Sequence, residues 1–174
     1  MDETVIPSTT GYPEPTGMKR SEVERFLAQP HVAVFSWQTP KGEVVSTPIW
    51  FAYRDGAFLM HTNHPSPKTR AILKNDQVAL AIQDEAPPYR YVNVRGVARL
   101  REEPEEALQL YEELARAYFG RLGGGFYLRR ALSDFEGEHV IIEVTPTKIN
   151  AMDGHAAVNP LQLLAMRALR KLGL

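Results

Sequence analysis

The sequence predicts a mainly β fold in which roughly six antiparallel strands form a small barrel with flanking helices. Strand-like runs rich in β-branched and aromatic residues follow one another closely and are separated by turn residues. The strongest helical patterns come late and do not alternate regularly with the strands, which disfavours a parallel doubly wound sheet. The chain also has neither a G-x-G-x-x-G nor a P-loop glycine pattern.

The N-terminal part predicts an arm, a short helix and a first strand. Residues 1–20 are expected to form a Pro-rich extended arm that is either loose or lies on a partner subunit. Ser21 and Glu24 fit a capping box for a short helix that ends near Pro30. Residues 32–37 are typical of a strand.

A hairpin is predicted next. Residues 44–53 are expected to form one strand that contains Pro48. Because proline donates no ladder hydrogen bond, this strand belongs at an edge, at a bulge or where the ladder opens. The pair Asp55-Gly56 predicts a tight turn into a third strand at residues 57–62.

The middle of the chain predicts a short helix and two more strands. The helix is expected at residues 68–74, and the strands at residues 77–83 and 91–100. Gly96 lies within the second of these strands and indicates a bulge or a close approach of another backbone.

The best helix is predicted at residues 104–119, where apolar residues recur at helical spacing and Gly120 follows. Residues 123–125 are three glycines and are expected to form a flexible connection, before one or two helical turns at residues 126–132. A last strand is predicted at residues 140–144, and residues 146–152 extend it beyond a break.

Three domains are therefore expected: an arm at residues 1–20, a barrel at residues 21–153, and a C-terminal helix within residues 154–174. This helix begins at Asn159-Pro160, and its apolar face predicts packing on the barrel or on a partner.

Composition narrows the classes of function. A formal net charge of −1 gives no global attraction to nucleic acid. The chain has no cysteine, which excludes disulfides and thiolate metal sites and suits a reducing cytoplasm. No apolar run approaches the roughly 20 residues of a membrane span, and no secretory signal pattern is present. We therefore expect a cytoplasmic protein without a membrane or nucleic-acid partner.

The sharpest candidate site is a turn that carries Ser66, Lys68 and Arg70 between two strands. A hydroxyl, exposed N–H groups and cations can converge there on a phosphate. The preceding strand ends in His61, Thr62 and Asn63, which add polar groups just before the turn; the alternative interpretation is a solvated basic turn. His61 and His64 alone make a weak metal site, so no metal is predicted.

A second candidate site is the segment at residues 46–51. Pro48 frees backbone groups to which a planar ring could hydrogen-bond along its edge. Thr47, Pro48, Ile49 and Trp50 are therefore candidates for a ring-binding wall, or else belong to an edge strand, whereas Phe51 is expected in the core. No Ser-His-Asp signature is present, so no catalytic residue is predicted.

These motifs resemble those of the pyridoxamine 5′-phosphate oxidase-like split-barrel superfamily. Thr62-Asn63-x-x-Ser66-x-Lys68 is similar to the T-N-x-x-S-x-K of the oxidase. The pattern from Pro87 to Ala98, P-P-Y-R-Y-V-x-V-x-G-x-A, and the segment T-P-I-W-F at residues 47–51 followed by Asp55-Gly56 resemble the flavin- or deazaflavin-dependent reductase branch. The resemblance covers about residues 20–152 and implies a split β-barrel of the FMN-binding type.

The resemblance also implies roles for single residues. Thr62, Ser66 and Lys68 would hold the cofactor phosphate with Arg70 close by, and residues 47–50 would lie along the ring and ribityl chain. Tyr91 stands where the oxidase has a glutamine that touches the flavin ring. Pro67 stands where the oxidase has an arginine, and the oxidase's C-terminal substrate-binding pattern is absent, which favours the reductase branch.

The implied function is an FMN-binding oxidoreductase that transfers hydride through the flavin N5 to a small-molecule substrate. The implied assembly is a homodimer with the cofactor at its interface. Two alternatives remain open: a reductase that uses the deazaflavin coenzyme F-420, and a non-catalytic carrier or sensor of flavin or haem.

Overall fold

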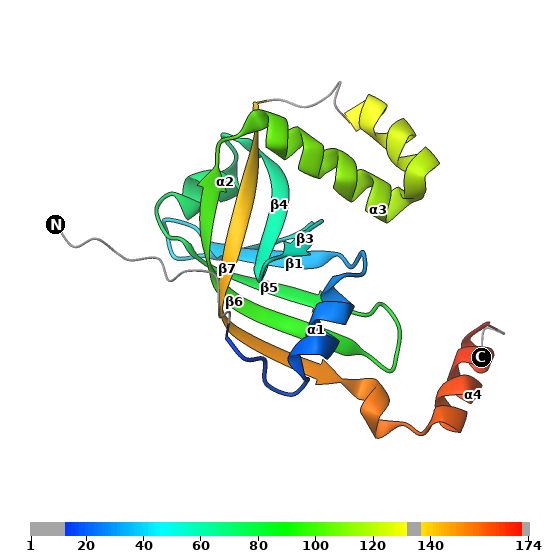
Figure 1. Cartoon of the computed structure of the whole chain (residues 1–174). Coiled ribbons are helices and arrows are strands. Elements are labelled where there is room, and N and C mark those ends of the chain that lie inside the picture. The colour runs from blue at the N-terminus through cyan, green and yellow to red at the C-terminus, as the bar shows by residue number, and fades with distance from the viewer. Residues whose placement is uncertain (1–12, 132–136, 172–174) are drawn as a thin grey trace.

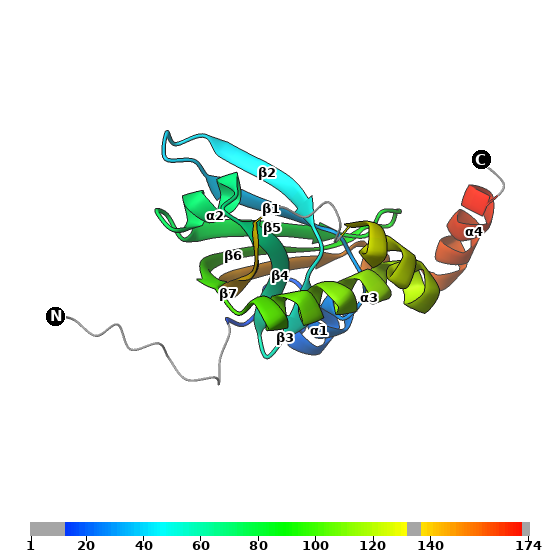
Figure 2. The ribbon, with the colours of Figure 1, turned by 90° about the horizontal axis from the view of Figure 1, so that it is seen from above.

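A single seven-stranded sheet organises the protein. The computed structural model describes residues 13–131 and 137–171. All neighbouring strands are antiparallel, in the order β2-β1-β5-β6-β7-β4-β3 (Figures 1 and 2). The strands are β1 (Ala33–Gln38), β2 (Val44–Ile49), β3 (Ala52–Arg54), β4 (Ala57–His64), β5 (Gln77–Gln83), β6 (Arg90–Arg101) and β7 (Glu138–Asp153). The helices are α1 (Arg20–Leu27), α2 (Pro67–Ile72), α3 (Pro104–Ala131), the 3₁₀ turn η2 (Gly154–Ala157) and α4 (Pro160–Lys171).

The sheet is split between β2 and β3, which are consecutive in sequence but form its two opposite edges. The expected single strand at residues 44–53 is therefore wrong: β2 pairs with β1, and β3 pairs with β4. Trp50 and Phe51 connect the two edges. The predicted edge position of Pro48 is confirmed, and the barrel is an open sheet of seven strands rather than a closed one.

The turn between β3 and β4 has the geometry predicted from its sequence. Asp55 has a φ of 50° and Gly56 has a φ of 80°, as a two-residue hairpin turn with positive φ at both positions requires. The register pairs Arg54 with Ala57, which confirms the predicted hairpin.

The core lies inside the curled sheet. Alternate residues of β1 point inward, namely Ala33, Phe35 and Trp37, and α1 adds Val23, Phe26 and Leu27. The start of α1 differs from the prediction. The Lys19 N–H donates to the Glu22 carboxylate at 2.8 Å, so the helix begins before Ser21, which cannot act as its cap.

β7 is continuous, so the expected break between residues 144 and 146 is wrong. The pairing register of β6 with β7 shifts between Arg95 and Gly96, because β7 has one extra residue at this point. A Cβ on Gly96 would lie 2.7 Å from the Thr145 carbonyl oxygen, which confirms the predicted close approach of another backbone.

α3 is a bent helix that lies against β4 and β7 (Figures 1 and 2). Gly120 has a φ of 73° and ends the first straight part, as predicted. The expected flexible connection at residues 123–125 is wrong, because these glycines are helical. A Cβ on Gly124 would lie 2.9 Å from the Ala115 carbonyl oxygen, so glycine here lets the two parts of the helix touch. The helical turns expected at residues 126–132 are present as far as Ala131, and Leu132 lies outside the described residues.

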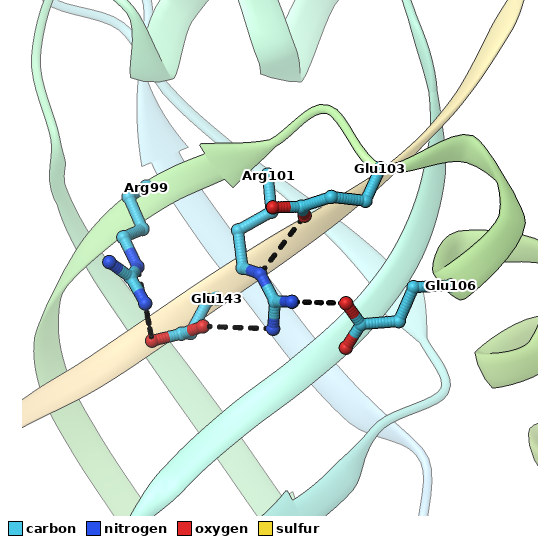
Figure 3. Close-up of polar contacts among 5 residues, drawn as sticks. All are labelled: Arg99, Arg101, Glu103, Glu106 and Glu143. Atoms are coloured by element: carbon cyan, nitrogen blue, oxygen red, sulfur yellow. Dashed lines mark hydrogen bonds and ion pairs between the residues drawn. The ribbon is translucent and has the colours of Figure 1, made fainter.

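An ion-pair network fixes the start of α3 on the sheet. Figure 3 shows the Arg101 guanidinium among the carboxylates of Glu103, Glu106 and Glu143. Glu143 on β7 also binds Arg99 at 2.7 Å. Because Glu143 is mostly buried, these contacts couple β6, β7 and α3 more strongly than exposed pairs would.

The two ends of the described chain differ in how they contact the sheet. Thr16 forms a parallel bridge to Asn150 on β7, so this part of the predicted arm lies on its own subunit. α4 stands clear of the sheet in both views (Figures 1 and 2), and Leu161 and Leu164 are exposed. Among the described residues, no helix is long and apolar enough to cross a membrane.

Candidate functional site

A pocket of about 320 Å³ opens between the connection from β2 to β3, strand β4 and helix α3. It contains four of the side chains predicted from the sequence: Pro48, Ile49, Trp50 and His61. The other lining residues are Val32, Tyr111, Leu114 and Tyr127. The walls are thus largely aromatic and aliphatic, with one imidazole.

Trp50 forms the centre of an aromatic cluster on one side of this pocket. Its ring stacks on Tyr118 with centroids 5.0 Å apart and an interplanar angle of 23°. Phe119 meets it edge-on at 5.3 Å, and Tyr127 lies tilted at 5.2 Å. These contacts hold the connection between β2 and β3 against both parts of α3.

The hydroxyl of Tyr118 attaches α3 to the connection between β2 and β3. The hydroxyl donates to the His31 carbonyl and accepts the Phe51 N–H at 3.4 Å. Burial raises the pKa of Tyr118 to about 12, although the Phe51 amide acts in the opposite direction. The phenol therefore stays protonated and keeps both bonds at any physiological pH.

His61 is a neutral imidazole in the pocket wall. Its ring stacks on Tyr111 with centroids 4.2 Å apart, and its Nε2 lies 2.9 Å from His139 Nδ1. Burial, assisted by the charges of His139 and Lys68, lowers the pKa of His61 to about 3. Burial also lowers the pKa of His139. The wall beside Tyr111 is therefore polar but uncharged.

Lys68 is half-buried on α2 and lies close enough to His61 to act on its charge. Burial lowers the pKa of the Lys68 amine. Neither Lys68 nor the exposed Arg70 forms an ion pair with any residue in the ranges 13–131 and 137–171. A partly desolvated cation without a counter-charge is a suitable partner for an anion.

Ser66 has a structural role that the sequence motif did not reveal. It is the N-cap of α2, whose observed span ends before the predicted residues 73 and 74. Its hydroxyl accepts the Thr69 N–H at 3.3 Å and lies 3.1 Å from the Thr69 hydroxyl. Thr62 is also buried, on the face of β4 opposite His61, whereas Asn63 is half-buried on the face of His61.

Seven of the eleven predicted site residues lie outside the pocket lining: Thr47, Thr62, Asn63, Ser66, Lys68, Arg70 and Tyr91. Tyr91 is half-buried on the outer face of the sheet, between Gln83 on β5 and Met152 on β7. Thr47 precedes the pocket wall, and its hydroxyl makes a long contact of 3.4 Å with the Pro48 carbonyl. His64, weighed as a metal ligand, instead bonds the Thr69 hydroxyl at 3.0 Å.

The pocket residues that the sequence interpretation missed come mainly from α3. Tyr111 and Leu114 are on its apolar face, and sequence periodicity cannot distinguish a face against a core from a face over a pocket. Tyr127 was missed because three glycines precede it and suggested a loop. His139 follows an acidic run and gave no signal of its contact with His61.

Comparisons with known proteins agree with this fold. A family model described as pyridoxamine 5′-phosphate oxidase matches residues 20–153. The conserved hypothetical protein Rv2991 from Mycobacterium tuberculosis is 20% identical with a TM-score of 0.69, over 87% of this chain and 94% of that chain. An F420 reductase is 26% identical with a TM-score of 0.57, over 72% of this chain and 94% of that chain. HutZ, the heme storage protein from Vibrio cholerae, is 16% identical with a TM-score of 0.54, over 73% and 89% of the two chains. No curated protein matches the sequence.

Proposed function

Because the chain belongs to the pyridoxamine 5′-phosphate oxidase family, we propose that it is an oxidoreductase that binds a phosphate-bearing flavin or deazaflavin. One observation carries the proposal: Lys68, a half-buried cation without a counter-charge among the described residues, is near enough to His61, which lines a pocket with aromatic walls, to act on its charge. A planar ring fits the aromatic walls, and a phosphate fits the cation.

The pocket wall would bind the ring. Trp50, Tyr111 and Tyr127 offer flat faces, and their mutual contacts limit the side-chain entropy lost on binding. His61 stays uncharged, so it offers hydrogen bonding without adding a charge beside the ring. Lys68 and Arg70 would hold the phosphate.

The chemistry would come from the cofactor, which when bound supplies hydride transfer at the central ring. The protein would bind and orient the ring, exclude water with the aromatic side chains of α3, and supply electrostatics. This division of labour needs no acid–base residue of the chain, in keeping with the lack of a Ser-His-Asp signature in the sequence.

The two candidate cofactors are FMN and coenzyme F-420. The likeness to an F420 reductase at 26% identity supports the second. Two cations close together in sequence, Lys68 and Arg70, would also suit its longer anionic tail. A substrate of small size would then meet the ring in the same pocket.

We further propose a homodimer with the cofactor at its interface. The outer face of β2, β1, β5, β6 and β7 presents Val34, Val44 and Met152, which are 42%, 75% and 42% exposed. No acidic residue points outward on this face between the free edge at β2 and the register shift of β6 with β7. The outward-pointing residues there are Val34, Ser36, Gln38, Val44, Ser46, Pro48, Gln77, Ala79, Ala81, Gln83, Tyr91, Asn93, Arg95, Lys148, Asn150 and Met152. Exposed apolar residues with few charges are typical of the centre of a protein interface. Pro48 belongs both to this face and to the pocket, so a partner there would border the cofactor.

Titration of the purified protein with FMN and, separately, with coenzyme F-420 tests the proposal. Visible absorption follows the ligand, and a change in tryptophan emission on binding reports mainly on Trp50, which lines the pocket, whereas the second tryptophan, Trp37, is buried in the core. We expect saturable binding of at least one ligand with quenching of the emission. Absence of binding for both would refute the proposed function. Reduction of the bound ring by a nicotinamide then distinguishes an enzyme from a carrier.

A further inference from the structure

The hydrogen-bond pattern of β2 shows which of its backbone groups face the free edge. The Thr39 N–H donates to the Glu43 carbonyl at 2.8 Å, so Thr39 and Glu43 are a hydrogen-bonded pair. Hydrogen-bonded and non-hydrogen-bonded pairs alternate along an antiparallel ladder. Counting along the register, the pair of Val34 with Pro48 is non-hydrogen-bonded.

A second observation supports this assignment. The hydroxyls of Ser36 and Ser46 lie 2.8 Å apart, two pairs before Pro48 and therefore in the same class. Side chains approach most closely in non-hydrogen-bonded pairs. The backbone nitrogen and carbonyl of Pro48 therefore point away from β1, toward the open edge of the sheet.

The edge of β2 consequently lacks a donor where it borders the pocket. Pro48 lines the pocket, but its nitrogen carries no hydrogen. Its carbonyl receives only the long contact from the Thr47 hydroxyl among the described residues, and a carbonyl oxygen can accept a second bond. At this position the strand can therefore accept a hydrogen bond but cannot donate one.

We propose that Pro48 determines cofactor specificity by disfavouring a ring that presents a hydrogen-bond acceptor at its central edge. This inference rests on the proposed binding of the ring along residues 47–50. The oxidised flavin ring has an acceptor nitrogen at position 5, whereas a 5-deazaflavin has a C–H group there. An acceptor left without a donor loses affinity, so the site should select the deazaflavin ring.

An edge proline also has a purely structural use, because it blocks pairing of the edge with another strand. The two roles have different consequences. A structural role would alter stability or association but would act equally on two ligands that differ by one ring atom. The specificity role alone changes the ratio of their affinities.

The test measures dissociation constants for FMN and 5-deaza-FMN, which differ only at ring position 5. We expect the wild-type protein to bind 5-deaza-FMN about threefold to tenfold more tightly, the effect of one neutral hydrogen bond. Pro48→Ala and Pro48→Val each restore an N–H and should shift the ratio toward FMN by a similar factor. Pro40→Ala, a matched change in the turn between β1 and β2, should keep the wild-type ratio.

Each outcome has one meaning. Equal or tighter binding of FMN by the wild-type protein would overturn the inference even if the Pro48 variants fail to fold. An unchanged ratio in folded Pro48 variants would also overturn it, while leaving the proposed function intact. Binding of neither ligand would overturn the proposed function itself.

Discussion

His61 links the pocket chemistry to the stability of the fold. Its imidazole is held between Tyr111 and His139 in a partly desolvated position that favours the neutral form. A single residue thus forms part of the candidate ring site and of the contact between β4, β7 and α3. Its protonation is therefore expected to be visible as a loss of stability.

The first prediction concerns acid pH. The pKa of His61 is about 3 in the folded protein against 6.5 for the free side chain, so the unfolded state binds its proton first. The stabilisation from neutral His61 is complete above pH 6.5 and is lost as the pH falls toward 3, by up to about 1.4 kcal/mol per pH unit. His61→Gln should therefore show a shallower loss of stability between pH 6 and pH 4 in urea unfolding. Equal slopes for the two proteins would contradict the described environment of His61.

At the residue scale, the sequence identified four side chains that the structure places in one pocket, but not the roles of the hydroxyls. Pro48, Trp50 and His61 line one pocket because the end of β2 and its connection to β3 meet β4 there, although β2 and β4 are not neighbours in the sheet. The sequence could not show that the Ser66 hydroxyl already caps α2, because a helix cap and a phosphate ligand use the same residue types.

α3 is the element that completes the pocket, and its bend decides where Tyr127 lies. The helix turns at Gly120, and Gly124 then packs on the backbone of Ala115 and Arg116. The sequence predicted the end at Gly120 but interpreted the glycines that follow as a loop. Glycine disfavours an isolated helix, and at Gly124 the close contact between the two parts of α3 explains its use.

The second prediction tests this contact with two neighbouring glycines. Gly124→Ala would place its Cβ 2.9 Å from backbone atoms, which should cost about 1–3 kcal/mol of stability and disturb the aromatic cluster. Gly125→Ala meets no atom within 4 Å and should stabilise the helix by about 0.5–1 kcal/mol. Thermal unfolding and Trp50 emission measure both effects. Equal responses of the two variants would argue against the bent helix.

The third prediction concerns the anchor of α3. Glu143→Ala removes the carboxylate shared by Arg99 and Arg101, as Figure 3 shows, and should cost about 1.5–3 kcal/mol. Glu112→Ala, which removes an exposed pair within the helix, should cost less than about 0.5 kcal/mol. Denaturant unfolding of both variants provides the comparison. A cost for Glu112 as large as that for Glu143 would contradict the proposed anchoring.

At the scale of the whole molecule, the close succession of strand-like runs predicted the antiparallel sheet, and Pro48 predicted the edge position of its strand. The split was missed because residues 44–53 are strand-like throughout, and local pattern does not reveal that the chain changes edges at Trp50 and Phe51. Long-range pairing, rather than propensity, decides such a change. The same topology leaves the outer face of β2, β1, β5 and β6 without a covering helix from α1 or α3, because α1 contacts β3 and α3 contacts β4 and β7.

The fourth prediction concerns assembly. If the outer face forms a homodimer, Val34→Glu should place a charge within the interface and yield monomers in sedimentation experiments at micromolar concentration. Leu73→Glu, at an exposed residue just after α2, should remain dimeric. A monomeric wild-type protein, or a dimer that tolerates Val34→Glu, would contradict this interface.

The affinity of Lys68→Ala for the cofactor tests the central claim most directly. The measurement uses whichever of FMN and coenzyme F-420 the wild-type protein binds, with Lys74→Ala as a control that removes an exposed charge just beyond the end of α2. Loss of a charge-assisted hydrogen bond to phosphate should weaken binding by about 1.5–3 kcal/mol for Lys68→Ala. Lys74→Ala should bind as the wild-type protein does. Equal affinities for all three proteins would show that the half-buried lysine does not hold the cofactor.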